Sequence, residues 1–282
     1  MSRSVDIAIV EPNIECEAET ADSPNKLYLK NESLVLLIDK DPQKLLVFNF
    51  NLNSKQASFK SITRNYQPLP VEAYNKPSFN SFLLDDKLYF VHASDDSLSF
   101  SIYDFKSGTE ISKFRTLADE AINYKNTPIL QEGGGTIYSQ NVHRELVKTK
   151  QFLRKILAGS AVITAVQNGQ NQHEVTIGAF KKIRQVSGGS MPMSGGALGG
   201  AMYGSGASVA SWTRVTRFKM LIDGNTSKHI DGEIGPSKSE QIQAYAEKIK
   251  IPDGGSSIFI VNGHYQFAYY DRDEKKLIIT KF

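Results

Sequence analysis

Residues that could perform catalysis are scattered along this chain. The histidines stand far apart, and none lies in a close metal-binding spacing such as H-E-x-x-H. They are His92, His143, His173, His229 and His264. The acidic doublets Asp85-Asp86, Asp95-Asp96 and Asp119-Glu120 could supply a general acid and base, but their turn-like or helix-start contexts favour solvated turn residues. No G-x-S-x-G motif is present, so the commonest hydrolase signature is missing.

Motifs for cofactors are incomplete. The glycines at 133–135 lack the lysine of a phosphate-binding loop, and 204–209 lacks the last glycine of a dinucleotide loop. Two acidic turns, at 223–228 and 271–275, carry lysine where a calcium loop needs glycine or an oxygen ligand. Cys16 is the only cysteine, which excludes an intramolecular disulfide and a cysteine-based zinc site. We therefore expect no cofactor, no metal site and no catalytic residue.

Composition describes a globular protein of nearly balanced charge. The 282 residues include 33 basic and 30 acidic side chains, a net charge of +3, which does not favour nucleic-acid binding. The first residues contain only a short apolar run interrupted by Asp6, so no signal peptide is expected. A cytoplasmic location follows if this N-terminus is native.

One long stretch, 185–213, contains no charged residue and is rich in glycine and serine. Its apolar members are Met191, Met193, Leu198, Met202, Tyr203 and Trp212, and Arg184 and Arg214 bound it. Pro192 and the many small residues argue against a transmembrane helix. One interpretation is a flexible connecting loop.

The other interpretation of 185–213 is an adaptable contact loop. Methionine and aromatic side chains suit an apolar partner or a membrane surface, and the flanking arginines suit anionic headgroups or an acidic partner. On this basis the sequence predicts a non-enzymatic binding or scaffold module that contacts a protein or envelope partner through its loops. A hydrolase-type enzyme, with a site assembled from distant residues, is the alternative.

The elements that would position these residues are mostly β-hairpins. In Leu98–Phe114, apolar and polar residues alternate on both sides of a turn that contains Asp104 and Gly108. The Asp104 carboxylate can accept hydrogen bonds from the backbone N–H groups that follow it, and Gly108 can adopt positive φ. This Y-D-x-x-S-G turn resembles the Tyr-Asp-x-x-Thr-Gly turn of several β-propeller families, including quinoprotein-like repeats. The resemblance implies a propeller fold and covers under a tenth of the chain.

Similar turn markers recur at intervals of 48 to 64 residues, although Lys55 and Lys275 replace the glycine in two copies. The markers are Asn51, Asp104, Asn168, Asp223 and Asp271. This spacing predicts an all-β protein, an irregular propeller of about five blades, in a single domain over 1–282. Amphipathic helical insertions are expected at 143–158 and 237–249, which leaves a mixed α+β fold as the alternative.

Overall fold

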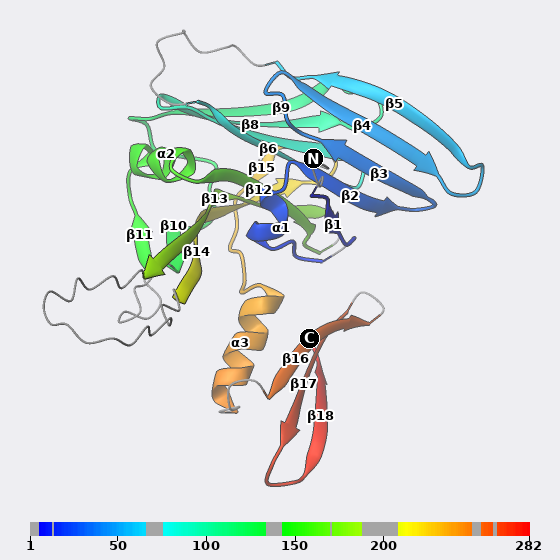
Figure 1. Cartoon of the computed structure of the whole chain (residues 1–282). Coiled ribbons are helices and arrows are strands. Elements are labelled where there is room, and N and C mark those ends of the chain that lie inside the picture. Colours follow the sequence, from blue (N-terminus) through cyan, green and yellow to red (C-terminus); the bar gives the residue numbers. More distant parts are fainter. Residues whose placement is uncertain are drawn as a thin grey trace, which may run out of the picture.

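The described residues form four β-sheets and three helices (Figure 1). This computed structural model describes residues 6–12, 14–65, 76–133, 143–169, 171–187, 208–249, 255–261 and 264–282, without the side chains of 184–187 and 208–212. Strands account for 55% and helices for 11% of the described residues, which confirms a mostly β protein.

Sheets I and II are meanders of consecutive antiparallel strands. Sheet I has the order β1-β2-β3-β4-β5, with β1 parallel to β2. Its strands are β1 (Ala8–Val10), β2 (Asn25–Lys30), β3 (Ser33–Ile38), β4 (Lys44–Asn51) and β5 (Gln56–Thr63). Sheet II contains β6 (Ser78–Leu84), β7 (Lys87–Ala93), β8 (Ser97–Asp104) and β9 (Glu110–Leu117).

Sheets III and IV complete the β structure. Sheet III has the order β11-β10-β14-β13-β12, and β15 also pairs with β14. Its strands are β10 (Ile129–Gly133), β11 (Arg144–Leu146), β12 (Ser160–Gln167), β13 (Gln172–Ser187), β14 (Ser208–Asp223) and β15 (His229–Ile230). Sheet IV consists of β16 (Ser256–Val261), β17 (His264–Asp271) and β18 (Lys276–Lys281).

The expected turn chemistry is present and recurs in all four sheets. The carboxylate of Asp104 accepts a hydrogen bond from the backbone N–H of Ser107 at 2.6 Å, and this bond lowers the pKa of Asp104. Side-chain oxygens of Asn51, Asp223 and Asp271 accept the backbone N–H groups two and three residues ahead in the same way. The oxygens of Asp223 and Asp271 therefore stabilise turns.

The residue four positions after each of these side chains has positive φ. Gly108 has φ +72°, and lysine at 55 and 275 and serine at 227 have φ between +52° and +57°. Lys55 and Lys275, which stand where the Asp104 turn has glycine, therefore adopt the same turn conformation. A side chain in this left-handed backbone region costs about 1 kcal/mol of stability relative to glycine. Asn168-Gly169 lies in a tighter hairpin turn between β12 and β13, where Gly169 has φ +70°, and this hairpin belongs to sheet III together with the Asp223 turn. The five expected markers thus fall on four sheets.

Sheet II lies between sheets I and III in the main hydrophobic core. Arg64, which directly follows β5 of sheet I, lies over the Phe90 ring of β7, 4.6 Å from its centroid. On the other side, β12 of sheet III lies against β6 and β7. Tyr89 of β7 contacts His173 of β13 with a ring separation of 6.1 Å. Both faces of sheet II are therefore covered, as its long apolar runs require.

The helices differ in part from the sequence-based expectations. Residues 143–158, expected to form one helix, contain the strand β11 and then a shorter helix, α2 (Thr149–Leu157). The side chains that bury this helix in the core, Phe152, Leu153 and Ile156, all lie after Thr149. A short helix that the sequence analysis does not include, α1 (Ala18–Asp22), lies between β1 and β2.

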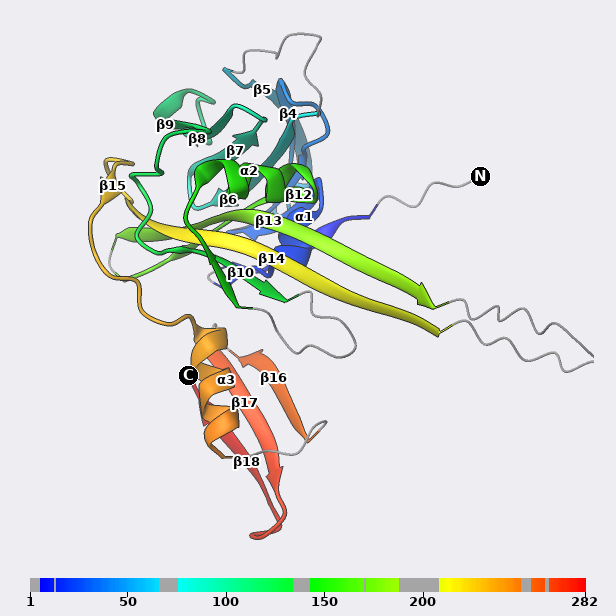
Figure 2. The ribbon, with the colours of Figure 1, turned by 90° about the vertical axis from the view of Figure 1, so that its left-hand side faces the viewer.

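The helix α3 (Lys238–Lys248) matches the expected 237–249 closely. It begins with a capping box, in which Ser237 accepts from the N–H of Glu240 and the Glu240 carboxylate accepts from the N–H of Ser237. The Tyr245 ring of α3 covers Phe267 of sheet IV at a centroid separation of 6.1 Å. Together α3 and sheet IV form a small unit set away from sheets I and II in both views (Figures 1 and 2).

Candidate functional site

The predicted contact loop begins and ends in the two strands of a long β-hairpin, and its residues 188–207 lie outside the described residues. β13 and β14 pair without interruption from Gln172↔Asp223 to Ser187↔Ser208, so the ends of the expected loop 185–213 are strands. Met191, Met193, Leu198, Met202 and Tyr203 lie outside the described residues. Arg184 and Trp212 lie in the two strands, and their side chains are not described. Arg214 is partly exposed on β14.

The outer part of this hairpin is a two-stranded ribbon. β12 pairs with β13 only as far as Phe180, and β10 pairs with β14 only as far as Arg214. Beyond Phe180 and Arg214 six residue pairs remain, from Lys182↔Thr213 to Ser187↔Ser208, and no third strand among the described residues pairs with them. At about 3.3 Å per residue these pairs extend roughly 20 Å. Figure 2 shows the two strands projecting from the rest of the sheet. We call these residues, 182–187 and 208–213, the ribbon.

Basic side chains gather where the ribbon leaves the sheet. Lys181 and Arg214 stand directly opposite each other, so their side chains share one face. Lys155 of α2 has a lowered pKa, chiefly through burial and also through the positive charges of Arg214, Arg144 and Lys181. We call these four side chains the basic root. On the other face of the ribbon, Lys182 pairs with Glu19 at 2.9 Å.

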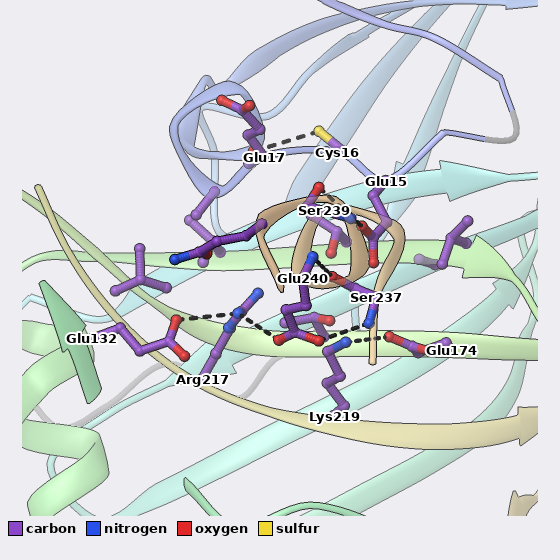
Figure 3. A pocket seen from close by; sticks show the side chains of 18 residues that line it. Glu15, Cys16, Glu17, Glu132, Glu174, Arg217, Lys219, Ser237, Ser239 and Glu240 are labelled. Carbon is purple, nitrogen blue, oxygen red and sulfur yellow. Dashed lines mark hydrogen bonds and ion pairs between the residues drawn. The ribbon is translucent and has the colours of Figure 1, made fainter. Parts of the chain in front are cut away.

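A separate cavity of about 290 Å³ lies where the N-terminal segment, sheet III and the start of α3 meet (Figure 3). Its charged lining residues come from distant parts of the chain. They are Glu15, Glu17, Glu132, Glu174, Arg217, Lys219 and Glu240. Only the capping box at 237–240 has a local sequence signal, so the cavity could not have been found from the sequence.

Ion pairs hold the walls of this cavity together. Lys219 Nζ lies 2.8 Å from Glu174 Oε1, and both side chains are largely buried. Arg217 bridges Glu132 at 3.1 Å and Glu240 at 3.4 Å, and thereby links α3 to sheet III. These pairs engage five of the seven charged side chains that line the cavity.

The cavity also lacks an activated nucleophile. Burial raises the pKa of the Cys16 thiol to about 12, so the thiolate is scarce at neutral pH. The segment around Cys16 instead joins the C-terminal unit to the body. The Glu15 carboxylate accepts a hydrogen bond from the Ser239 hydroxyl at 3.3 Å, and the Glu15 N–H donates to the Tyr265 hydroxyl at 3.1 Å. We interpret the cavity as a seam between parts of the molecule.

The histidines do not assemble a catalytic centre in the described part of the chain. His173 has its Nδ1 in contact with the Tyr89 hydroxyl, and its Nε2 lies 3.4 Å from Asp85. Tyr89 is fully buried and cannot reach a substrate. His229 Nε2 lies 3.0 Å from Asn126 Oδ1, in a separate contact on β15. No histidine lines the cavity in Figure 3, so the hydrolase alternative gains no support there.

The described ranges contain neither a cluster of metal ligands nor a helix that could cross a membrane. Within the ranges that the structure describes, no three His, Cys, Asp or Glu side chains are grouped as metal ligands. No helix in those ranges has both the length and the apolar character needed to cross a bilayer.

Comparisons with known proteins give little information. No protein-family model matches the chain, and no curated protein matches it in sequence. A solved structure of a prolyl endopeptidase is similar at a TM-score of 0.28 and 12% identity, over 87% of this chain. The match spans 39% of that endopeptidase chain. A TM-score this low establishes neither a shared fold nor a shared activity.

Proposed function

We propose that this chain is a non-enzymatic binding or scaffold module that contacts a protein partner or an envelope membrane surface through the ribbon and the loop at its tip. One observation carries this proposal: β13 and β14 continue for six residue pairs beyond the described strands that flank them. A two-stranded ribbon without a third strand or a packed face is only marginally stable in water. We therefore attribute the ribbon to contact with a partner and not to a contribution to the stability of the fold.

The chemistry of the ribbon suits a partner with an anionic surface. The basic root places four positive side chains where the ribbon leaves the sheet. Each basic residue held near an anionic membrane surface contributes about 1 kcal/mol of attraction. The exposed edges of a ribbon can also pair with a strand of a protein partner. A hydrolase remains the second candidate, with less support from the geometry.

We also infer that the architecture is an irregular β-propeller of about five blades, in which sheets I, II and III are three successive blades. Sheets I and II share a turn scheme that supports this inference. Asn31, in the turn between β2 and β3, has φ +51°, and Asp85, in the turn between β6 and β7, has φ +52°. Asn51 and Asp104 mark the turn before the last strand of each sheet. An experimental structure in which β2, β6 and β12 do not surround one axis would contradict this architecture.

The binding proposal is tested by shortening the loop and by reversing charges at the root. In one variant an Asn-Gly turn replaces 188–207 between Ser187 and Ser208, and in the other Lys155→Glu and Lys181→Glu are combined. Sedimentation with phosphatidylcholine vesicles, with and without phosphatidylglycerol, is compared with partner recovery from a cell extract. We expect the charge reversal to weaken binding to anionic vesicles by at least about thirtyfold, because two attractions of about 1 kcal/mol each are lost, and the shortened loop to lose partner recovery.

Matched controls separate this effect from net charge and from misfolding. Lys40→Glu combined with Lys125→Glu changes the charge equally at two exposed lysines outside the root. Far-UV circular dichroism checks that every variant is folded. Unchanged vesicle binding and unchanged recovery of every partner in both test variants would overturn the proposal.

A further inference from the structure

A groove of about 700 Å³ lies between sheets I and II at one end of their strands. Sheet I contributes the turn at 30–33 and parts of β4 and β5, and sheet II contributes residue 86 and residues 105–106 from two of its turns. None of the described residues that line this groove belongs to the ribbon, the basic root or the cavity in Figure 3. A ligand of this groove would therefore be separate from the partner proposed for the ribbon.

The buried face of sheet I becomes polar where it lines the groove. Along β4 this face carries Leu45 and Val47, which are almost fully buried, and then Asn49, because alternate residues of a strand share a face. On the neighbouring strand β5, Ser58 stands opposite Asn49 and Lys60 stands opposite Val47. The groove thus presents hydrogen-bonding groups on a face that elsewhere forms the hydrophobic core.

Asn49 carries a buried oxygen that lacks a partner. Its Oδ1 is shielded from solvent, and no described residue donates a hydrogen bond to it. A buried acceptor without a donor is unfavourable, and such atoms are uncommon in folded proteins. A molecule in the groove that carries a hydroxyl group would supply the missing donor.

Three lysines that line the groove gather at the Phe105 ring, and we call Lys30, Lys60 and Lys106 the lysine cluster. The ammonium groups of Lys30 and Lys60 lie over this ring, 4.7 and 4.2 Å from its centroid. Asp86 pairs with Lys30 at 2.5 Å and with Lys106 at 3.1 Å. Three positive charges and this one negative charge leave a surplus of two positive charges.

The lysine cluster also has hydrogen-bond donors to spare. An ammonium group has three donors, and Lys30 and Lys60 each use two of them in contacts with the protein. Burial lowers the pKa of Lys60, and the charge of Lys30 adds to this shift while Asp104 opposes it. Glu32, the other carboxylate of the groove, accepts a hydrogen bond from the Asn53 side chain. A bound anion would therefore meet both unused donors and unbalanced positive charge.

We propose that this groove binds a small phosphate ester that also carries hydroxyl groups, such as a sugar phosphate. Its phosphate lies among the ammonium groups of the lysine cluster, and one of its hydroxyl groups donates to Asn49 Oδ1. A phosphate ester carries close to two negative charges at neutral pH and so offsets the surplus, whereas a carboxylate would offset half of it.

The spacing of the two contacts sets the size of the ligand. Asn49 and Lys60 are diagonal neighbours on adjacent strands, a relation that places residues about 7–8 Å apart. A sugar phosphate spans this distance between a ring hydroxyl and the phosphate. Inorganic phosphate is too short to make both contacts, so the two ligands should differ in affinity.

Titration calorimetry of the full chain measures this difference. The ligands are glucose 6-phosphate, ribose 5-phosphate, inorganic phosphate, and glucose and ribose without phosphate. We expect at least one of the two esters to bind roughly tenfold more tightly than inorganic phosphate, because it adds the bond to Asn49. The sugars without phosphate should not bind measurably.

Four variants separate the two contacts from each other and from misfolding. Lys60→Met should weaken ester binding about tenfold or more, because a charged hydrogen bond is lost. Lys106→Met should act in the same direction, and its side chain is 77% exposed, so the fold should tolerate the change. Asn49→Ala should lower ester affinity to that of inorganic phosphate and leave inorganic phosphate binding unchanged. Lys44→Met, at an exposed position of β4 outside the groove, is the control.

Three outcomes would overturn the proposal. Absence of heat from both esters would show that the groove does not bind them. Equal affinities of the esters and inorganic phosphate would exclude the contact with Asn49. Ester binding that is unchanged in Lys106→Met, or weakened equally in Lys44→Met, would exclude the lysine cluster. Circular dichroism establishes that each variant is folded, and Lys106→Met decides the role of the cluster if Lys60→Met does not fold.

Discussion

Sheets II and IV use the same turn but bury their side chains to opposite extents. Asp104 and Asp271 each accept the backbone N–H groups that follow them. In sheet II, Phe100 is fully buried between the rings of Tyr89 and Phe114. In sheet IV, Phe259 is 38% exposed. The difference shows that turn chemistry forms a hairpin, whereas the neighbours of each face determine how strongly it is held.

Truncation of one aromatic side chain in each sheet tests this comparison most strongly. Phe100→Ala removes a ring that is packed on both sides and should lower the free energy of unfolding by about 3–5 kcal/mol. Phe259→Ala in dilute solution should cost less than about 1 kcal/mol. Urea denaturation of both variants measures the two losses. Equal losses would show that sheet IV is as tightly packed as sheet II.

A buried lysine between sheets I and II makes the stability of this part of the molecule depend on pH. Lys26 Nζ donates to the Ser23 carbonyl at 2.7 Å and to Asn80 Oδ1 at 3.0 Å. Burial lowers the pKa of Lys26 to about 8. Between pH 8 and about 10 the unfolded chain therefore binds a proton that the folded chain does not bind, and stability rises with pH.

The variant Lys26→Met should remove this rise in the free energy of unfolding, which is at most about a few kcal/mol. Urea midpoints of the unchanged chain and the variant, measured from pH 7 to pH 10, give the difference in slope. Lys281→Met, at an exposed position of sheet IV, is the matched control and should keep the rise. Parallel pH curves for the unchanged chain and Lys26→Met would contradict the prediction.

The turns themselves should give the smallest effects and opposite signs. Gly108 has φ +72°, so Gly108→Ala places a side chain in the left-handed region and should cost about 1–2 kcal/mol. Lys275 has φ +52° in the equivalent turn of sheet IV, and Lys275→Gly should relieve up to about 1 kcal/mol. Hydrogen exchange of the flanking strands measures both. Slower exchange in β8 and β9 after Gly108→Ala would refute the equivalence of the two turns.

Sequence patterns were sufficient where the determining contacts are local. The Asp104 turn and its Gly108 were predicted from five adjacent residues, and the structure confirms both. The capping box of α3 lies within four residues and the helix begins where the pattern indicated. The limits of α2 were less predictable, because the packing of Phe152 and Ile156 on distant strands sets its start.

The candidate site shows the opposite situation. The uncharged stretch was visible in the sequence, but the extent of pairing from Lys181 to Ser187 was not, because how far two strands pair depends on the partner strand and not on the residue types of one strand. The cavity lining joins Glu15, Glu132 and Glu240 from three distant segments, and no spacing rule connects them.

The sequence by itself determined the mostly β content, the repeated turns and the charge-free stretch. Each depends on residue type and on contacts within a few residues, for which strand alternation and turn hydrogen bonds are sufficient. Only the tertiary structure decided which apolar faces are covered. Sheets I and II carry equally apolar strands, yet Phe100 is buried and Phe59 is exposed. Alternation places a side chain on a face, but burial requires a second sheet to pack there.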